Sequence, residues 1–441
     1  MKILATIGPE TIRKKNLKYL LKHTSLIRLN SSHNSVDWHK SAIKSIKKLK
    51  PKAMVLVDFP GIKPRTENLK NIIVKKNDVI AFSFKTKIKG KFIKLTKPLP
   101  KIYKKSSFSL DDGKILFKTK SIKDQVIFGR AINNCIIKPK KGLNIPGSIY
   151  DDKMQEKIYF KHFRIFKKSK IDAVGLSFVQ NENIIIKLKK KYPNIIMVSK
   201  VENSEGLKNV DQISKFSDVI MIDRGDLSAE IGDENLYEAI NTISLSAKKY
   251  GKPLIMATEN LETFYKSNNP SRNDIVSLGF SKQINSDIIM LSEETALSPK
   301  WKKIFDWLRG FLKNKPKKLK KYNPDEIFWS LSKLINNYSL ILFTKHGLMF
   351  DKIFKNNLTN QVIVFTDTKK TFDIARFYKN VTCILTPKFN NKNISQFYYK
   401  MIKKYKTKIF DHNDFAFLIT ISFPKKGARA NSISLINKKN I

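Results

Sequence analysis

The chain has 441 residues, enough for two or three domains, and 41% of them are hydrophobic, so it can bury a substantial core. Lys and Arg outnumber Asp and Glu by 86 to 37, which gives a formal net charge of +49. The lysines are spread along the whole chain among many Asn, Ile and Phe residues, whereas a binding face would concentrate its charge. We interpret the excess as drift in codon usage, and expect no nucleic acid and no membrane as a partner.

Cysteine usage and hydropathy indicate the cellular compartment. Cys135 and Cys383 lie far apart in the sequence and cannot form a disulfide framework or a thiolate metal site. The apolar run at the N-terminus ends at Gly8 and Pro9, too early for a signal peptide, and no later run reaches the roughly 18 residues of a membrane span. These features predict a cytoplasmic protein.

Short apolar runs rich in β-branched residues recur along the first 300 residues, with segments of helical length between them. Near-continuous apolar strands joined by helices indicate a parallel sheet covered on both faces, and eight such units predict a (β/α)8 barrel, the TIM barrel. The runs are, in chain order, 3–7, 25–30, 53–58, 173–179, 195–200, 219–223, 253–258 and 288–291.

The remaining segments predict an insertion and a second α/β unit. Short alternating patterns such as 72–83, 91–95 and 125–135 indicate antiparallel strands of a small β-barrel domain set into a barrel loop. Near the C-terminus, four strand-like runs alternate with helical stretches and indicate a smaller doubly wound sheet. The predicted organisation is a barrel in two parts, 1–66 and 143–312, around an inserted lid at 67–142, then a lysine-rich linker at 313–322 and a C-terminal α/β domain at 323–441.

Every barrel run ends in polar, Gly or Pro residues, and the carboxyl ends of the strands are where barrel active sites lie. Lys200 and Glu202 are two residues apart, so their side chains should leave one strand on the same face. Asp226 follows the next run, and two carboxylates with substrate oxygens suit Mg²⁺. The alternatives for these residues are a structural ion pair and, for Asp226, a helix cap.

Arginines and one threonine add to these strand ends. Four of the ten arginines, Arg28, Arg65, Arg224 and Arg272, lie in strand-end motifs, where a planar fork can hold phosphate or carboxylate. Thr258 ends a strand and could relay a proton through its hydroxyl, or serve as a helix cap.

Taken together, these motifs resemble the pyruvate kinase family in order and approximate spacing. The resemblance is strong over the barrel and its insertion and weak over the C-terminal third. The motifs are Thr6–Pro9, Arg28–His33, Asp111–Gly113, Lys141–Gly147, Lys200–Gly206, Arg224–Leu227, Ala257–Glu262, Pro270–Arg272 and Met290–Ala296.

The resemblance implies Mg²⁺- or Mn²⁺-dependent transfer of phosphate from phosphoenolpyruvate to ADP, giving pyruvate and ATP in glycolysis, by a homo-oligomer, either a tetramer or a dimer. Lys200 would stabilise the moving phosphoryl group, and Glu202 and Asp226 would ligate the metal. Thr258 would lie beside the enolate carbon where a proton is delivered. The resemblance also implies roles for a larger set: Arg28 and Arg65 as phosphate clamps, Gly225 in substrate binding, Lys141, Asn30, His33 and Pro9 with Arg65 at the nucleotide, Asp112 in the lid, and Asn30, Ser32 and Asp58 in a monovalent-cation pocket.

Some residues depart from the family's pattern. Lys63 stands where many members have glutamate, and its ammonium group could replace the monovalent cation, so we expect that K⁺ is not required. Asp223 replaces a usual alanine beside the substrate loop, where an added negative charge should repel phosphoenolpyruvate unless it is neutralised. Its role is open from the sequence.

Two other readings of the sequence remain. One is a Mg²⁺-dependent carbon–carbon lyase of the phosphoenolpyruvate/pyruvate barrel group, which would not need the lid insertion or the nucleotide-side motifs. The other is a decayed kinase that acts as a basic binding protein. That reading requires eroded catalytic positions, whereas Lys200, Glu202, Asp226 and Thr258 are all present.

Overall fold

The computed structural model describes residues 1–85, 88, 90–102, 107–111, 113–313, 338–347, 360–389, 393–411, 413–422 and 430–441. Contacts divide the chain into two units, one formed by 3–247 and 254–307 and the other by 1–2, 248–253 and 308–441. The predicted linker 313–322 lies, after Lys313, outside the described residues, and the domain boundaries expected from the sequence stay a prediction. No helix in the described ranges has the length and apolar character needed to cross a bilayer.

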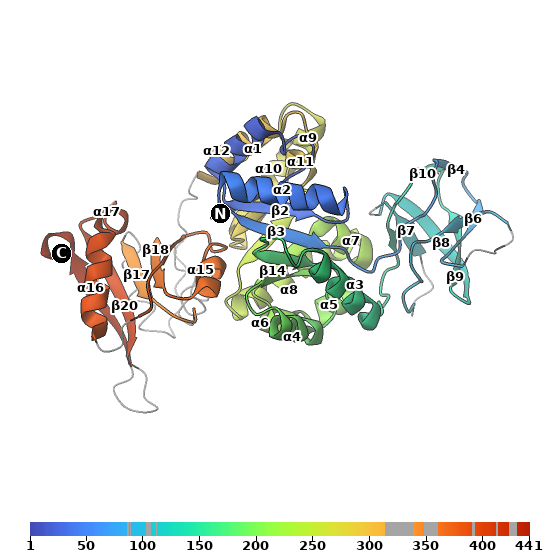
Figure 1. The fold of residues 1–441 in the computed structure, drawn as a ribbon. Coiled ribbons are helices and arrows are strands. Elements are labelled where there is room, and N and C mark those ends of the chain that lie inside the picture. Colours follow the sequence, from blue (N-terminus) through green and yellow to red (C-terminus); the bar gives the residue numbers. More distant parts are fainter. Residues whose placement is uncertain are drawn as a thin grey trace. The chain divides into compact units, whose positions relative to one another are not determined.

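The first unit contains a closed parallel barrel of eight strands, which confirms the predicted TIM barrel (Figure 1). Nearly every strand residue is buried, because the helices cover the outer face and side chains fill the interior. The strands are β1 (Lys2–Thr6), β2 (Leu26–Asn30), β3 (Met54–Phe59), β12 (Ala173–Leu176), β13 (Ile196–Val201), β14 (Val219–Asp223), β15 (Leu254–Ala257) and β16 (Ile288–Leu291).

Helices follow the barrel strands, and polar caps mark where several of them begin. The Asn181 side chain accepts a hydrogen bond from the Asn183 N–H at the start of α4, and Ser271 and Asp274 form a capping box at the start of α10. The helices are α1 (Lys14–His23), α2 (Val36–Leu49), α3 (Asp152–Ile165), α4 (Glu182–Lys191), α5 (Ser204–Lys208), α6 (Val210–Phe216), α7 (Arg224–Ile231), η1 (Asp233–Asn235), α8 (Leu236–Lys249), α9 (Glu262–Lys266), α10 (Arg272–Gln283), α11 (Glu293–Ala296) and α12 (Trp301–Lys313).

Aspartates tie the amino-terminal ends of the barrel strands together. Asp172, Asp218 and Asp287 each directly precede a strand, and each carboxylate accepts the backbone N–H at or near the start of the neighbouring strand, at 2.7, 2.9 and 2.9 Å. Lys47 and Lys189 pair with the first two of these carboxylates at 2.6 and 2.7 Å. The charges at this end of the barrel therefore hold neighbouring strands together.

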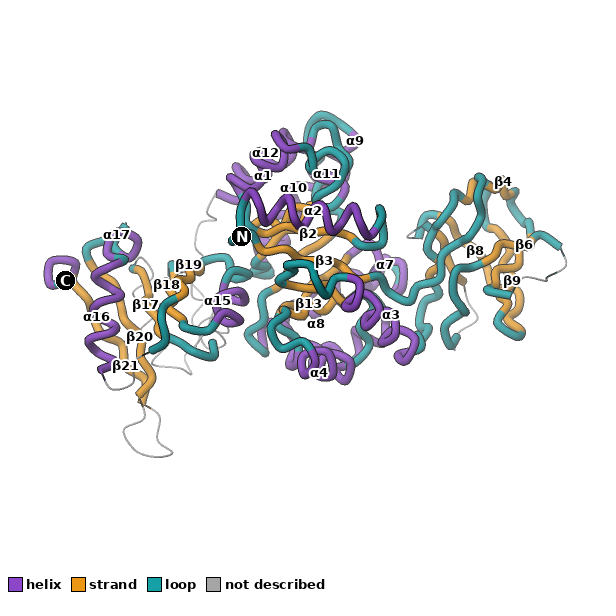
Figure 2. Tube along the Cα trace, viewed as in Figure 1, coloured by secondary structure: helices purple, strands orange, loops and turns teal. Residues whose placement is uncertain are grey.

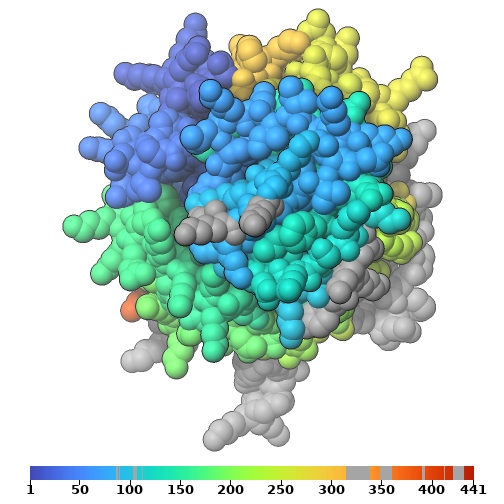
Figure 3. Space-filling model, turned by 90° about the vertical axis from the view of Figure 1, so that its right-hand side faces the viewer, coloured from blue at the N-terminus to red at the C-terminus, as the bar shows by residue number. Residues whose placement is uncertain are grey.

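The inserted segment forms a six-stranded sheet of order β11-β7-β8-β9-β5-β6 and a two-stranded sheet β10-β4. Surface atoms of this segment, in blue to cyan, face the viewer in Figure 3. Three phenylalanines, Phe82, Phe108 and Phe117, fill its core with ring centroids 5.1 to 5.4 Å apart. The strands are β4 (Ile72–Val74), β5 (Val79–Ser83), β6 (Phe92–Lys94), β7 (Ser107–Leu110), β8 (Ile115–Lys123), β9 (Val126–Ala131), β10 (Cys135–Ile137) and β11 (Leu143–Asn144).

One strand pair departs from the antiparallel order expected for this insertion. β6 pairs in parallel with β5, whereas the other pairs in these two sheets are antiparallel. Alternating apolar and polar residues show that a strand has one buried face, but they do not show its direction, so this pairing could not be read from the pattern.

The C-terminal part forms a five-stranded sheet of order β19-β18-β17-β20-β21, in which only the edge pair β20-β21 is antiparallel among the described strands. Alternate residues serve two cores: Leu340 and Leu342 pack with Ala375 of α15, and Ile341 packs with Met401 of α16. The two helices lie on opposite sides of this sheet (Figure 2). This is the smaller doubly wound sheet that was predicted. Its elements are β17 (Ser339–Phe343), β18 (Val362–Thr366), α15 (Lys369–Ala375), β19 (Val381–Leu385), α16 (Ile394–Lys404), α17 (Lys406–Ile409), β20 (Phe415–Ser422), β21 (Ala430–Asn437) and η3 (Lys438–Asn440).

Candidate active site at the carboxyl ends of the barrel strands

Lys200 is the centre of a buried charge cluster at the end of β13. Its Nζ lies 2.6 Å from Glu202 Oε1, 3.1 Å from Asp223 Oδ2 and 3.7 Å from Asp58 Oδ2. All four residues are at most 4% exposed. The spacing of Lys200 and Glu202 thus brings both side chains to the same place, while Asp58 and Asp223 arrive from β3 and β14.

The Glu202 carboxylate is held by backbone on one side only. Its Oε2 accepts the Phe178 N–H at 2.8 Å, in the loop after β12. Its Oε1 contacts the Lys200 ammonium but accepts no well-aligned hydrogen bond. Burial raises the pKa of Glu202 to about 8, because Lys200 does not fully compensate for the lost water and for the Asp226 and Asp223 charges nearby.

Asp226 lies in the first turn of α7 and pairs with Lys63, which comes from the loop after β3. The Lys63 Nζ is 2.6 Å from Asp226 Oδ1, and Lys63 is 4% exposed. Burial by itself would raise the pKa of the Asp226 carboxyl, but Lys63 and Lys200 lower it below its usual value. Asp226 is therefore held ionised at neutral pH.

Arg28 and Asp58 form a second buried ion pair beside the cluster. Arg28 Nε donates to Asp58 Oδ2 at 2.7 Å, and Arg28 Nη1 donates to Thr6 Oγ1 at 3.1 Å. The register places Asp58 beside Gly175 of β12, where an added Cβ would lie 1.9 Å from Asp58 Oδ1. Only glycine at position 175 leaves room for this carboxylate.

The donor set fits a divalent metal ion. Glu202, Asp223 and Asp226 each offer a carboxylate oxygen, and these oxygens lie within 4.8 Å of one another, the one such group among the described residues. Oxygen donors suit Mg²⁺ and Mn²⁺. The raised pKa of Glu202 indicates unbalanced negative charge, which a dication would stabilise in its ionised form.

Thr258 lies directly after β15 and its hydroxyl faces the same cluster. Thr258 Oγ1 donates to Asp223 Oδ1 at 3.0 Å and accepts the Gly225 N–H at 3.1 Å. Thr258 and Glu259 both have positive φ, of 53° and 48°, which is unusual for residues other than glycine. The predicted residues Lys200, Glu202, Asp226, Thr258 and Gly225 are thus brought together.

The residues predicted for the nucleotide side lie in loops, except Asn30, which is the last residue of β2. Arg65 is exposed and its Nη1 donates to the Lys140 carbonyl at 3.2 Å, while Lys141 Nζ pairs with Asp111 at 2.6 Å. The Asn30 side chain accepts the N–H of Ser32 at 3.1 Å. The remaining two, Pro9 and His33, are exposed. Asp112 lies outside the described residues, and all of these nucleotide-side roles stay predictions.

The sequence did not predict the contacts of two residues in the cluster, Ser177 and Asp223. Ser177 Oγ accepts a hydrogen bond from Lys200 Nζ at 3.3 Å, and Asp223 contacts both Lys200 and Thr258. The signal for Asp223 was its position as the last residue of an apolar run, the same signal that marked Lys200. The role of Asp223 could not be assigned from the sequence, because the sequence does not show which side chains the Asp223 carboxylate contacts.

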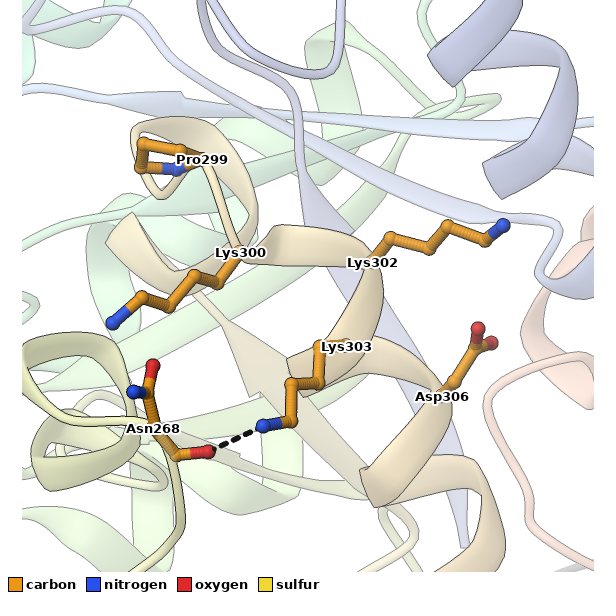
Figure 4. Close-up of a pocket in the computed structure, with 6 residues that line it drawn as sticks. All are labelled: Asn268, Pro299, Lys300, Lys302, Lys303 and Asp306. Atoms are coloured by element: carbon orange, nitrogen blue, oxygen red, sulfur yellow. Dashed lines mark hydrogen bonds between the residues drawn. The ribbon is translucent and has the colours of Figure 1, made fainter.

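A separate pocket of about 450 Å³ lies beside α12 and contains none of the predicted site residues. Lys300 and Lys303 donate to the carbonyls of Ser267 and Asn268 at 3.0 and 2.8 Å, the second shown in Figure 4. These lysines tie down the turn after α9. We assign the pocket no role in the chemistry.

This chain is similar in sequence and in fold to proteins that are already known. The family model described as pyruvate kinase, barrel domain, matches residues 1–299. A pyruvate kinase of Thermococcus litoralis is 30% identical over 67% of this chain, but the match spans 65% of that protein's length. A pyruvate kinase of Thermotoga maritima is 26% identical over 99% of this chain and 98% of its own length. The crystal structure of pyruvate kinase from Pyrobaculum aerophilum aligns with a TM-score of 0.78 at 20% identity, covering 98% of this chain and 99% of that one, a likeness of fold.

Proposed function

Because the chain belongs to the pyruvate kinase family, we propose that it transfers the phosphoryl group of phosphoenolpyruvate to ADP, giving pyruvate and ATP. The observation that carries the proposal is the buried Lys200 ammonium beside three carboxylates at the barrel's carboxyl end. Burial lowers the pKa of Lys200, but Glu202, Asp58 and Asp223 raise it well above its usual value, so the side chain stays cationic. A fixed cation at this point stabilises charge on a phosphoryl group in transfer.

Glu202 and Asp226 would hold Mg²⁺ or Mn²⁺. When bound, the metal would neutralise charge on the phosphoryl oxygens and on the enolate. Arg28 and Arg65 would bind phosphate oxygens through their guanidinium groups. The Arg28 guanidinium also donates a hydrogen bond to Asp58. A substrate carboxylate would bind near Gly225 at the start of α7. The Thr258 hydroxyl, whose oxygen accepts the Gly225 N–H at 3.1 Å, would pass a proton to the enolate carbon.

Potassium is not required in this proposal. Lys63 brings its ammonium group into the loop after Asp58, and its Nζ lies 2.6 Å from Asp226 Oδ1. Adding KCl at constant ionic strength, with tetramethylammonium chloride as the balancing salt, is expected to change turnover by less than about twofold. A large rise in turnover would show that a monovalent cation site is needed despite Lys63.

The proposed kinase function also carries a proposed oligomeric state and a proposed cellular location for the enzyme. We infer a homo-oligomer, a tetramer or a dimer, whose size light scattering on the purified chain would measure. The reaction uses phosphorylated anions on both sides, and such anions do not diffuse across bilayers, so we place the enzyme in the cytoplasm, where they are retained.

The test of the activity is a coupled assay with phosphoenolpyruvate, ADP and Mg²⁺, in which pyruvate is measured. Lys200→Met is expected to lower kcat by about 10³-fold, since it removes the charge that faces the phosphoryl group. Lys189→Met is the matched control, because Lys189 also pairs with a buried aspartate, Asp218, but at the opposite end of the barrel. No pyruvate from folded wild-type protein would overturn the kinase assignment, and a carbon–carbon lyase would then be tested with the same metal.

A further inference from the structure

Asp223 connects the two side chains that the proposed reaction needs most. It is the last residue of β14 and 4% exposed. Its Oδ1 accepts a hydrogen bond from Thr258 Oγ1 at 3.0 Å, and its Oδ2 lies 3.1 Å from Lys200 Nζ. The Asp223 carboxylate therefore contacts Lys200, the residue proposed for phosphoryl transfer, with one oxygen, and Thr258, the residue proposed for proton transfer, with the other.

The Thr258 hydroxyl has one hydrogen and two acceptors within reach. Its oxygen already accepts the Gly225 N–H at 3.1 Å. Its hydrogen can point to Asp223 Oδ1 at 3.0 Å or to the Ala257 carbonyl at 2.8 Å. A charged acceptor makes a hydrogen bond about twice as strong as a neutral one, so the carboxylate decides the direction of the O–H bond.

The backbone of Thr258 is held as firmly as its hydroxyl. Its carbonyl accepts a hydrogen bond from Arg224 Nη2, and the same guanidinium donates to Asn260 Oδ1 at 3.0 Å and to Ser277 Oγ at 2.5 Å. A β-branched residue at φ 53° costs free energy, and such strain persists only where surrounding contacts over-determine it. Three successive residues, Asp223, Arg224 and Gly225, thus fix the hydroxyl hydrogen, the carbonyl and the hydroxyl oxygen of Thr258.

We propose that Asp223 is a positioning residue for proton transfer: it holds the Thr258 hydroxyl hydrogen on its own Oδ1 and balances the Lys200 charge. When the Thr258 oxygen takes a proton from the pyruvate methyl group, its hydroxyl hydrogen passes to Asp223, and both protons move back when the enolate carbon is protonated. This inference rests on the proposed kinase function and deepens it. Asp223 is also the third carboxylate of the acidic cluster. Because Asp223 accepts the Thr258 hydrogen bond, we assign orientation to Asp223 and metal binding to Glu202 and Asp226.

The experiment separates proton transfer from phosphoryl transfer and from metal binding. Exchange of the pyruvate methyl hydrogens in D₂O, with Mg²⁺ and inorganic phosphate present, is followed by proton NMR. Phosphoryl transfer from phosphoenolpyruvate to ADP is measured in the coupled assay. Binding of Mn²⁺ to the protein without substrates is measured by electron paramagnetic resonance.

Asp223→Ala is expected to slow methyl exchange about 10- to 100-fold, the scale of a positioned proton transfer. The KM for phosphoenolpyruvate should stay the same or fall, because a negative charge has been removed from the site. Mn²⁺ binding should change by less than about threefold. Asp223→Asn can still accept the Thr258 hydrogen bond but cannot take up the proton, so it should slow methyl exchange as much as Asp223→Ala does. It replaces the alanine variant if that variant does not fold.

Asp218→Asn is the matched control, since Asp218 is a buried aspartate that precedes the same strand at its other end and accepts the Met197 N–H. It should lower stability and leave the ratio of exchange to phosphoryl transfer unchanged. Equal loss of exchange and transfer in the Asp223 variants would overturn the positioning role. Mn²⁺ binding weakened more than tenfold would overturn it in favour of a metal ligand. Wild-type protein that forms no pyruvate in the coupled assay would instead refute the proposed function.

Discussion

Glu230 makes the stability of the barrel depend on pH. It lies in α7 and is 1% exposed; its Oε1 accepts the Tyr150 hydroxyl at 2.9 Å, while Oε2 has no hydrogen-bond partner. Burial raises the pKa of Glu230 from 4.5 to about 8, although Lys63 and Tyr150 act to lower it. The folded protein therefore favours the neutral acid.

The sign of the pH effect follows from proton binding. Below pH 4.5 the carboxyl is protonated in both the folded and the unfolded chain, and its contribution to stability is fully present. As pH rises from 4.5 to 8, the unfolded chain releases the proton and the folded chain keeps it, so the free energy of unfolding falls. A shift of 3.5 units at 1.36 kcal/mol per unit gives about 5 kcal/mol as an upper figure, and we expect about 3–5 kcal/mol.

Glu230→Gln removes this cost, because the amide is neutral at every pH and can still accept the Tyr150 hydrogen bond. Denaturant unfolding at pH 5 and pH 9 is the measurement. The variant should match the wild type within about 1 kcal/mol at pH 5 and exceed it by about 3 kcal/mol at pH 9. Glu238→Gln, which changes an exposed glutamate in the following helix, α8, is the control and should show no such difference. An equal effect of Glu230→Gln at both pH values would refute the reasoning.

Two further predictions concern the site and the insertion. Arg224→Lys keeps the charge but loses the planar fork that holds the Thr258 turn, so kcat in the coupled assay should fall about 100-fold with a smaller change in KM; an unchanged kcat would show that the turn holds without the fork. Phe117→Ala empties the centre of the inserted sheet and should cost about 3–5 kcal/mol there, visible as faster hydrogen exchange in β7 and β8 while the barrel strands keep their protection; equal loss of protection in both would contradict an independent core.

The acidic cluster shows how far local sequence can predict a site. Lys200 and Glu202 share a face because side chains in a strand alternate, and this holds before any tertiary contact forms. Asp226 could be predicted beside them because neighbouring parallel strands end at one edge. The Lys63–Asp226 pair could not, since the two residues are 163 positions apart and meet only through the path of the loop after β3.

The barrel itself was determined by the sequence. Eight buried runs of the right length and spacing specify parallel strands covered by helices, and their polar ends mark the active side, because these signals are local and repeat along the chain. Only the tertiary structure decided which side chains touch: that Gly175 makes room for Asp58, that Arg224 holds a turn of positive φ, and that Asp223 faces both Lys200 and Thr258. Those contacts depend on strand register and on side-chain direction across neighbouring strands, and no local pattern contains either.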